Sequence, residues 1–221
     1  MEYSLIRSKR KTIAICINRD GSVTVRAPLR AAQSAIDRFV CEKKDWITNK
    51  SGQMSALAET RERFAVTQGS SLLLLGCSYP VTYAKEVAFT GTSFTVPKED
   101  FSVLKPKLID LYVALARKVI FERTEYFSKK TGLFPAAVRI GSANSYWGCC
   151  SGKNRLNFSW KLIMAEPAVI DYVVVHELAH LTEHNHSERF WRLVEQILPN
   201  YRELREKLKL FEKILRKQDW S

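Results

Sequence analysis

Residues 172–191 read YVVVHELAHLTEHNHSERFW, and this stretch holds all four histidines of the 221-residue chain. His176 and His180 are four positions apart, so an α-helix would place both rings on one face, one turn apart. Taken alone, YVVV favours a strand, because β-branched residues fit a pleated sheet. The histidine pair requires a helix, for which Pro167 suits the first turn. We therefore predict a helix that is buried on most of its sides.

The spacing H-E-x-x-H predicts a zinc site. Two neutral imidazoles on one helix face can hold Zn²⁺ at about 2.0–2.1 Å from each nitrogen. Glu177 follows the first histidine. In this arrangement the glutamate is not a ligand but the general base for a water at the open position of the metal. We therefore predict Zn²⁺ as the cofactor, His176 and His180 as metal ligands, and Glu177 as the catalytic residue.

Two histidines compete to be the third ligand that a catalytic zinc needs. His184 continues the spacing, but on an uninterrupted helix it would lie about 6 Å further along the axis than His180. His186 is better placed if the helix ends before it. Asn185 tolerates the left-handed conformation that ends helices, and Ser187 suits the N-cap of a following helix. We predict His186 as the ligand and His184 as a neighbouring or exposed residue.

A closed structural zinc site is the alternative to a catalytic one. Such a site has four Cys or His ligands and does not need Glu177, and Cys149 or Cys150 could supply the fourth. Adjacent side chains point in different directions, so these two thiols are poorly placed to hold one ion together, and we expect them to pack in a turn. A cysteine nucleophile would need a further histidine as its base, and none lies outside 176–186.

The chain is basic, with a formal net charge of +12. Residues 1–70 carry much of the excess, with 13 Lys and Arg against 7 Asp and Glu, so the charge lies away from the histidines. A basic surface is typical of proteins that meet a nucleotide or a nucleic acid. A solvated surface that keeps the protein soluble explains the charge equally well.

The cysteines and the apolar runs of the sequence indicate the cellular compartment. The five cysteines are an odd number without framework spacing, which indicates reduced thiols. The basic residues of the N-terminal stretch are not followed by the apolar run of a secretory signal. The longest apolar runs, LLLLGC and YVVV, are too short to cross a bilayer. We expect a soluble, cytoplasmic protein without membrane contact.

The remaining patterns predict an α+β fold, with a zincin-like core made of the active-site helix and a small mixed sheet, and an N-terminal β-rich portion. We expect one domain over 1–221, with the β-rich portion at 1–100 and the catalytic core at 101–215. The expected elements are a hairpin at 11–28, a helix at 30–50, a loop or helix extension at 51–63, short strands at 71–97, a long helix at 103–130, strands at 136–142 and 155–164 around a turn-rich loop, and two C-terminal helices divided near Pro199.

The strand expected at 155–164 has two interpretations. Leu156, Phe158 and Trp160 alternate with polar residues, which is typical of a half-buried strand. As an edge strand beside the histidine helix, it could bind an extended peptide by strand addition. As an inner strand, it could not. The sequence favours neither interpretation.

The motifs together resemble a known family. SYWGCCSGKNRLNFSWKLIM and the HELAHLTEHNHSERFW run that follows are similar to the YgjP-like metallopeptidase domain, a relative of SprT-like and minigluzincin-type zinc proteins. Cys149 stands where the family usually has serine. The upstream segments RSKRKTIAICI, VRAP and LLLLGCSYPV are also similar to the family. The matching residues include Trp147, Gly148, Cys150, Ser151, Asn157, the run 170–180, Asn185, His186, Ser187, Phe190 and Trp191.

The resemblance implies zinc held by His176, His180 and His186, with Glu177 as the catalytic base. The function that we expect is therefore a zinc-dependent hydrolase, in its simplest form a metallopeptidase acting on a peptide or protein. One alternative is a metal-dependent nucleotide hydrolase that uses the same site on a phosphoanhydride. The other is a nucleic-acid-associated SprT-like protease or binding module. The sequence predicts no oligomeric state.

Overall fold

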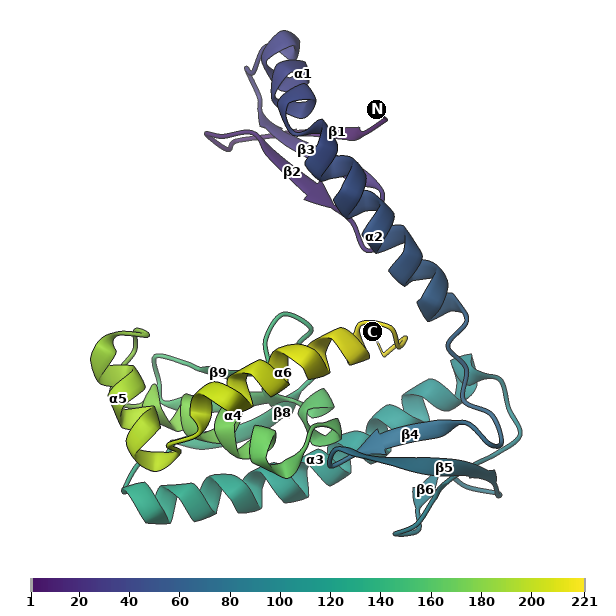
Figure 1. Ribbon diagram of the computed structural model, residues 1–221, viewed down its shortest axis with the longest axis vertical. Coiled ribbons are helices and arrows are strands. Elements are labelled where there is room, and N and C mark those ends of the chain that lie inside the picture. Colours follow the sequence, from purple (N-terminus) through teal and green to yellow (C-terminus); the bar gives the residue numbers. More distant parts are fainter. Residues whose placement is uncertain (1, 221) are drawn as a thin grey trace. The chain divides into compact units, whose positions relative to one another are not determined.

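The computed structural model describes residues 2–220, which form two compact units (Figure 1). The first runs to Phe64 and includes Arg216–Asp219, and the second comprises Ala65–Leu215 with Trp220. The strands that follow Phe64 belong to the same unit as the long helix after them. The single continuous domain expected over 1–221, with portions at 1–100 and 101–215, stays a prediction.

The first unit is a three-stranded sheet with two helices. Its strands lie in the order β1-β3-β2, with β1 parallel and β2 antiparallel to β3. The predicted hairpin is confirmed, and its turn contains Gly21, whose φ of 88° favours glycine. Its buried core is formed by Val23, Val25, Ala27, Ile36, Val40 and Ile47. The elements are β1 (Ser4–Ser8), β2 (Ala14–Ile17), β3 (Val23–Pro28), α1 (Gln33–Glu42) and α2 (Lys44–Glu62).

The helix expected over 30–50 is two helices. Lys43 interrupts it with φ −103° and ψ 9°, which lie outside the helical region. The second helix, α2, then continues to Glu62. Residues 51–62 are therefore the helix extension, which was one of the two expected possibilities.

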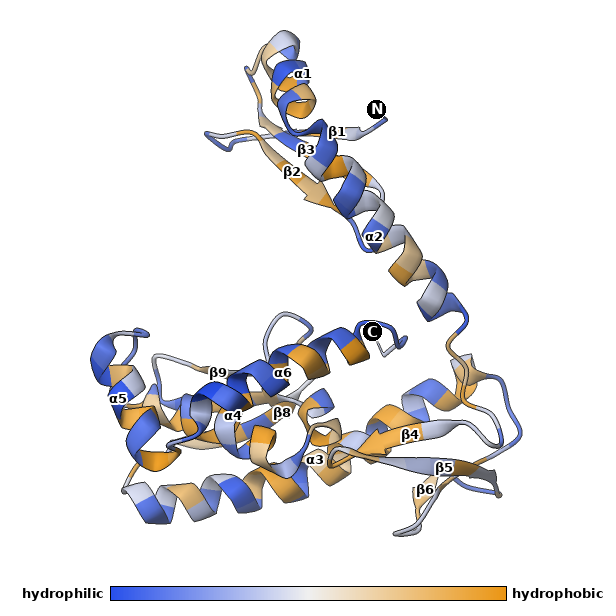
Figure 2. Ribbon diagram, in the orientation of Figure 1, coloured by the Kyte–Doolittle hydropathy of each residue, from blue (hydrophilic) through white to orange (hydrophobic). Residues whose placement is uncertain are grey.

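The second unit begins with a four-stranded sheet in the order β4-β5-β7-β6 and a 31-residue helix, α3. The predicted helix end is confirmed at Gly132, which takes a φ of 76° as the C-cap of α3. Buried Tyr112 of α3 stacks on Trp160 and donates a 2.9 Å hydrogen bond to the carbonyl of Leu73. In Figure 2, α3 alternates between hydrophilic and hydrophobic residues. The elements are β4 (Ser71–Leu74), β5 (Cys77–Tyr83), β6 (Ala88–Phe89), β7 (Phe94–Val96) and α3 (Phe101–Thr131).

A small mixed sheet follows, in the order β8-β10-β9. β10 is the inner strand, parallel to β8 and antiparallel to β9, so the edge-strand interpretation of residues 155–164 is wrong. The strand also ends at Ser159, and residues Trp160–Met164 form a 3₁₀-helix whose bulky side chains are buried. The loop expected before β10 contains the edge strand. The strands are β8 (Ala137–Gly141), β9 (Gly148–Cys150) and β10 (Arg155–Ser159).

The YVVV run lies in a helix, α4 (Pro167–Ala179), as predicted. Nine of its 13 residues are buried, so tertiary packing overrides the strand preference of the β-branched run. Arg123 of α3 holds Asp171 of α4 with two hydrogen bonds of 2.5 and 2.7 Å. The last helices, α5 (Glu188–Ile197) and α6 (Tyr201–Leu215), are separated around Pro199 as expected.

Helices and small mixed sheets within one chain confirm the α+β class. The five cysteines are free thiols. Among the described residues, no helix combines the length and the apolar character that crossing a bilayer demands.

Candidate metal centre

The motif helix ends earlier than the sequence suggests. α4 stops at Ala179, and His180 is its C-cap with φ −67° and ψ −11°. The Thr182 hydroxyl and the Glu183 amide both donate to the carbonyl of Ala179, at 3.2 and 3.0 Å, and satisfy the helix end. The left-handed conformation expected at Asn185 is wrong, since that residue has no positive φ. The chain turns back five residues sooner than predicted.

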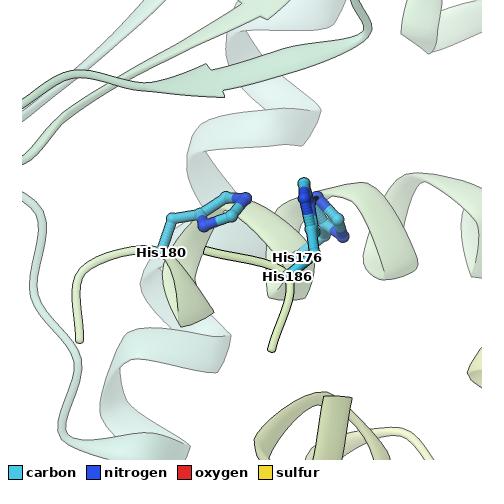
Figure 3. A group of neighbouring side chains, drawn as sticks. All are labelled: His176, His180 and His186. Atoms are coloured by element: carbon cyan, nitrogen blue, oxygen red, sulfur yellow. Dashed lines mark hydrogen bonds between the residues drawn. The ribbon is translucent and has the colours of Figure 1, made fainter. Parts of the chain in front are cut away.

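This early turn brings three histidines together (Figure 3). His176, His180 and His186 each offer a ring nitrogen, and these atoms all lie within 4.8 Å of one another. The Nε2 atoms of His176 and His186 are 3.0 Å apart. Two nitrogens that bind one tetrahedral zinc at about 2.0–2.1 Å must lie at a similar separation. The spacing of the donors therefore fits a single metal ion.

The loop after α4 delivers the third histidine. Ser187 caps α5 as predicted, because its side chain accepts a hydrogen bond from the Phe190 amide. Buried Phe190 packs beneath the cluster, with its ring 4.5 to 4.9 Å from the three histidine rings. His184 is exposed and lies outside the group.

The environment favours the neutral form of two of the imidazoles, those of His176 and His186. Burial, followed by the neighbouring His180 and His186, lowers the pKa of His176 to about 3. Burial and the neighbouring His180 also lower the pKa of His186. A positive charge on α6, Arg205, acts in the same direction on both. A neutral imidazole keeps the lone pair that a metal requires.

The structure also fixes one tautomer. His180 Nδ1 lies 3.0 Å from the carbonyl oxygen of Glu183. A carbonyl only accepts, so Nδ1 carries the proton and Nε2 presents its lone pair to the centre. His176 Nδ1 is buried and has no hydrogen-bond partner among the described residues. A set of three converging nitrogens, with one orientation fixed from outside, fits a divalent metal that prefers imidazole ligands.

Glu177 is a buried carboxylate beside this cluster. Its side chain is 4% exposed, and within residues 2–220 its Oε2 atom has no hydrogen-bond partner. Burial raises the pKa of Glu177 to about 8. An unpaired buried carboxylate is costly, and such groups gather at functional sites. A bound cation would offset that cost.

Gly148 of β9 leaves the space that Glu177 occupies. A Cβ atom at this position would lie 2.6 Å from the Cγ and 2.8 Å from the Oε1 of Glu177. Glycine is therefore the residue that allows β9 to approach the carboxylate so closely. In the sequence, Gly148 stood out only through its family resemblance, because a contact across 29 positions leaves no periodic signal.

A stack of aromatic rings joins the histidine cluster to a positively charged side chain. Trp191 stacks on His186 with ring centroids 5.6 Å apart and on Tyr201 at 5.3 Å. The guanidinium of Arg205 lies 5.1 Å from the centroid of the Trp191 ring. The exposed Arg205 was not singled out from the sequence, where it is one of many charges on an amphipathic helix.

The two adjacent cysteines lie nearby but outside the histidine group. Neither Cys149 nor Cys150 belongs to the converging set of ligand atoms found within the described chain. Burial, and then the charge of Glu177, raises the pKa of Cys150. A thiol with a raised pKa is a poor thiolate ligand, so a fourth thiolate ligand from this residue is not favoured.

A histidine pair at the end of a helix, a third histidine from the next loop and an adjacent buried glutamate are the features of a metallopeptidase. The chain belongs to the YgjP-like metallopeptidase domain family, whose family model matches residues 11–211. Among solved structures, the metallopeptidase zymogen abylysin of Pyrococcus abyssi is similar at 25% identity and a TM-score of 0.39, over 45% of this chain and 97% of that one. A comparison with curated protein sequences found no match.

Proposed function

We propose that this chain is a zinc-dependent peptidase in which His176, His180 and His186 hold the metal and Glu177 is the general base. The convergence of three ring nitrogens within 4.8 Å, beside a buried carboxylate, carries this proposal. Family membership supports the metallopeptidase class. Zinc is the metal that three imidazoles and an open position suit best.

The proposed mechanism assigns a proton to Glu177. Zinc, when bound, would act as a Lewis acid that polarises the scissile carbonyl and acidifies a water. Glu177 would take one proton from a water molecule whose oxygen adds to the scissile carbonyl carbon, and would give that proton to the nitrogen as the C–N bond breaks. The site must ionise Glu177 at neutral pH, and a nearby divalent charge lowers the pKa that burial has raised. Arg205 is close enough to act on His176 and His186, and a cation near the site can stabilise developing negative charge.

The edge strand β9 offers a place for an extended substrate. Trp147 and Ser151, which flank it, each form a 2.9 Å backbone hydrogen bond with β10. Hydrogen-bonded positions alternate along an antiparallel pair, so Gly148 and Cys150 direct their N–H and C=O groups away from β10. A peptide can add to these groups as a further strand. Since Gly148 touches Glu177, such a peptide would pass the catalytic base.

Metal content and turnover test the proposal together. We expect about one zinc per chain in the wild type and in Glu177→Gln, because the glutamine removes only the base. Casein-derived peptides should be cleaved by the wild type and not by the variant. Wild-type rates in Glu177→Gln would show that the mechanism is wrong, and zinc retained after His186→Ala would contradict the ligand set.

Nucleotide hydrolysis is the second candidate function, and the net charge of +12 favours it. The same metal site would direct water to a phosphorus atom. Nucleoside triphosphates assayed in parallel with the casein peptides separate the two. Release of phosphate or pyrophosphate that is lost in Glu177→Gln, without peptide cleavage, would replace the peptidase proposal with this one.

A further inference from the structure

A basic pocket lies on the β8-β10-β9 sheet. Its volume is about 560 Å³. Three cationic side chains, all exposed, line it, together with smaller polar groups. The lining residues that matter here are Arg139, Lys153, Arg155, Ser151, Asn157 and Cys149.

Strand register explains which side chains meet in this pocket. Asn157 pairs with Arg139 on one neighbouring strand and with Cys149 on the other, so the three share one face of the sheet. Leu156 and Phe158 point to the opposite face and are fully buried. The sheet therefore has one face toward the core and one toward solvent, and the basic groups belong to the second.

The cations of the pocket have no acidic partner within residues 2–220. Arg139, Lys153 and Arg155 form no ion pair with any acid in the part of the chain that the structure describes. No Asp or Glu lines the pocket. Three positive charges around one cavity favour an anionic occupant, and two of them are guanidinium groups, which can bind a carboxylate through two hydrogen bonds.

The pocket and the candidate metal centre meet at β9. Gly148 faces Glu177, whereas Cys149, the next residue, lines the pocket. Neighbouring strands share the alternation of their side chains. In a peptide added beside β9, the residue opposite Gly148 would face the catalytic base and the residue opposite Cys149 would face the pocket.

The distances suit a side chain of moderate length. Strands lie about 4.8 Å apart, so the added strand would lie about 10 Å from β10, which carries Arg155. Lys153 comes from the turn between β9 and β10. It is closer in sequence to the edge strand β9 than Arg155 is. A carboxylate on the peptide and a long cationic side chain of the pocket can span this gap between them.

We propose that this pocket is a specificity subsite for an acidic side chain of the substrate peptide, next to the residue that lies against Gly148. The inference rests on the proposed peptidase function and names its substrate class, namely peptides with Asp or Glu beside the scissile position. Basic residues at that position are disfavoured by repulsion from the three cations.

The test uses three fluorescence-quenched peptide pools of random sequence, which share one fixed central position that is Glu, Gln or Lys. For zinc-loaded wild type at about 150 mM salt, where long-range steering is screened, we expect kcat/KM to be at least tenfold higher for the Glu pool than for the Lys pool. The double variant Lys153→Glu, Arg155→Glu should reverse this order. Lys118→Glu is the matched control, because this exposed lysine of α3 lies outside the pocket, and it should keep the wild-type preference.

Binding separates a failure of the subsite from a failure of the peptidase proposal. The same pools are titrated into zinc-loaded Glu177→Gln, with and without the pocket substitutions. Preferential binding of the Glu pool that the pocket substitutions abolish, without turnover by the wild type, would retain the subsite and remove the peptidase. Cleavage of all three pools at equal rates would overturn the subsite alone. Circular dichroism checks that the double variant is folded, and Arg155→Gln, which should weaken the preference, is the milder substitute if it is not.

Discussion

Burial of a single carboxylate gives the metal-free protein a distinct pH dependence. Burial raises the pKa of Glu177 from 4.5 to about 8, so the folded state binds its proton more tightly than the unfolded state. The stability contributed by the protonated group is complete below pH 4.5 and is lost as the pH rises toward 8. His176 has the opposite shift, and its contribution grows as the pH rises from about 3 to 6.5.

Replacing Glu177 by glutamine should therefore change this pH dependence in the presence of a chelator. We expect the free energy of unfolding of wild type, relative to Glu177→Gln, to fall by on the order of 2 kcal/mol between pH 5 and 8. The His176 contribution is common to both proteins and cancels. Urea unfolding at each pH measures the difference, and a constant difference would show that Glu177 ionises normally.

A methyl group at Gly148 tests how closely β9 must approach the base. In Gly148→Ala the new Cβ would lie 2.6 Å from the Glu177 Cγ, so either the carboxylate or the strand must move. We expect at least a tenfold loss of kcat, since misplacing a catalytic group by about 1 Å can cost a hundredfold. Zinc content should stay unchanged. Gly52→Ala is the control, because its Cβ meets nothing within 4 Å.

At the scale of elements, one ion pair joins the long helix to the motif helix. Arg123 of α3 and Asp171 of α4 are partly buried and bonded through two hydrogen bonds. Arg123→Gln should reduce the free energy of unfolding by about 1 kcal/mol, the contribution expected of a well-aligned pair near the surface. Thermal unfolding measures this. Lys129→Gln removes a pair with Glu125 that is mostly exposed to solvent and should change stability much less.

The sequence predicts elements well where the signal is local. The i, i+4 histidine pair, the Ser187 cap and the glycine at 132 each act within one turn of chain, and the structure contains each of them. The sequence does not predict the end of α4, where the Thr182 hydroxyl and the Glu183 amide bond to the carbonyl of Ala179. A threonine is a weaker sequence signal for a helix end than a glycine. The three-residue strand β9 was missed because it is shorter than a pattern of alternation can reveal.

Contacts between distant residues were beyond prediction from one sequence. The place of Gly148 against Glu177 and the row of Arg139, Asn157 and Cys149 across three strands both depend on strand order, which periodicity does not encode. The inner position of β10 is another example, since its alternating residues suit an edge and a central strand alike. The candidate ligands, by contrast, lie within eleven positions of one another, so their spacing in the sequence is enough to predict them.

For the whole molecule, metal binding and folding should be linked. The histidine cluster joins the end of α4 to the loop before α5, so a ligand that needs both favours the folded state. Zinc at about 100 times its Kd should add about 2.7 kcal/mol to the free energy of unfolding. The melting temperature with zinc and with a chelator measures this difference. His184→Ala should keep the effect and His186→Ala should lose it.

The loop between α4 and α5 supplies His186 and also orients the His180 ring through the Glu183 carbonyl. The carbonyl that orients this ring belongs to the segment that also supplies His186, so one short stretch of backbone is fastened to the centre at two points. Removal of a bound metal ion would free the His186 side chain and weaken the hydrogen bond between His180 and the Glu183 carbonyl. Amide hydrogen exchange across residues 183–187 should then be slower with metal than without it. The exchange rate of this loop would report how much of the protein has metal bound.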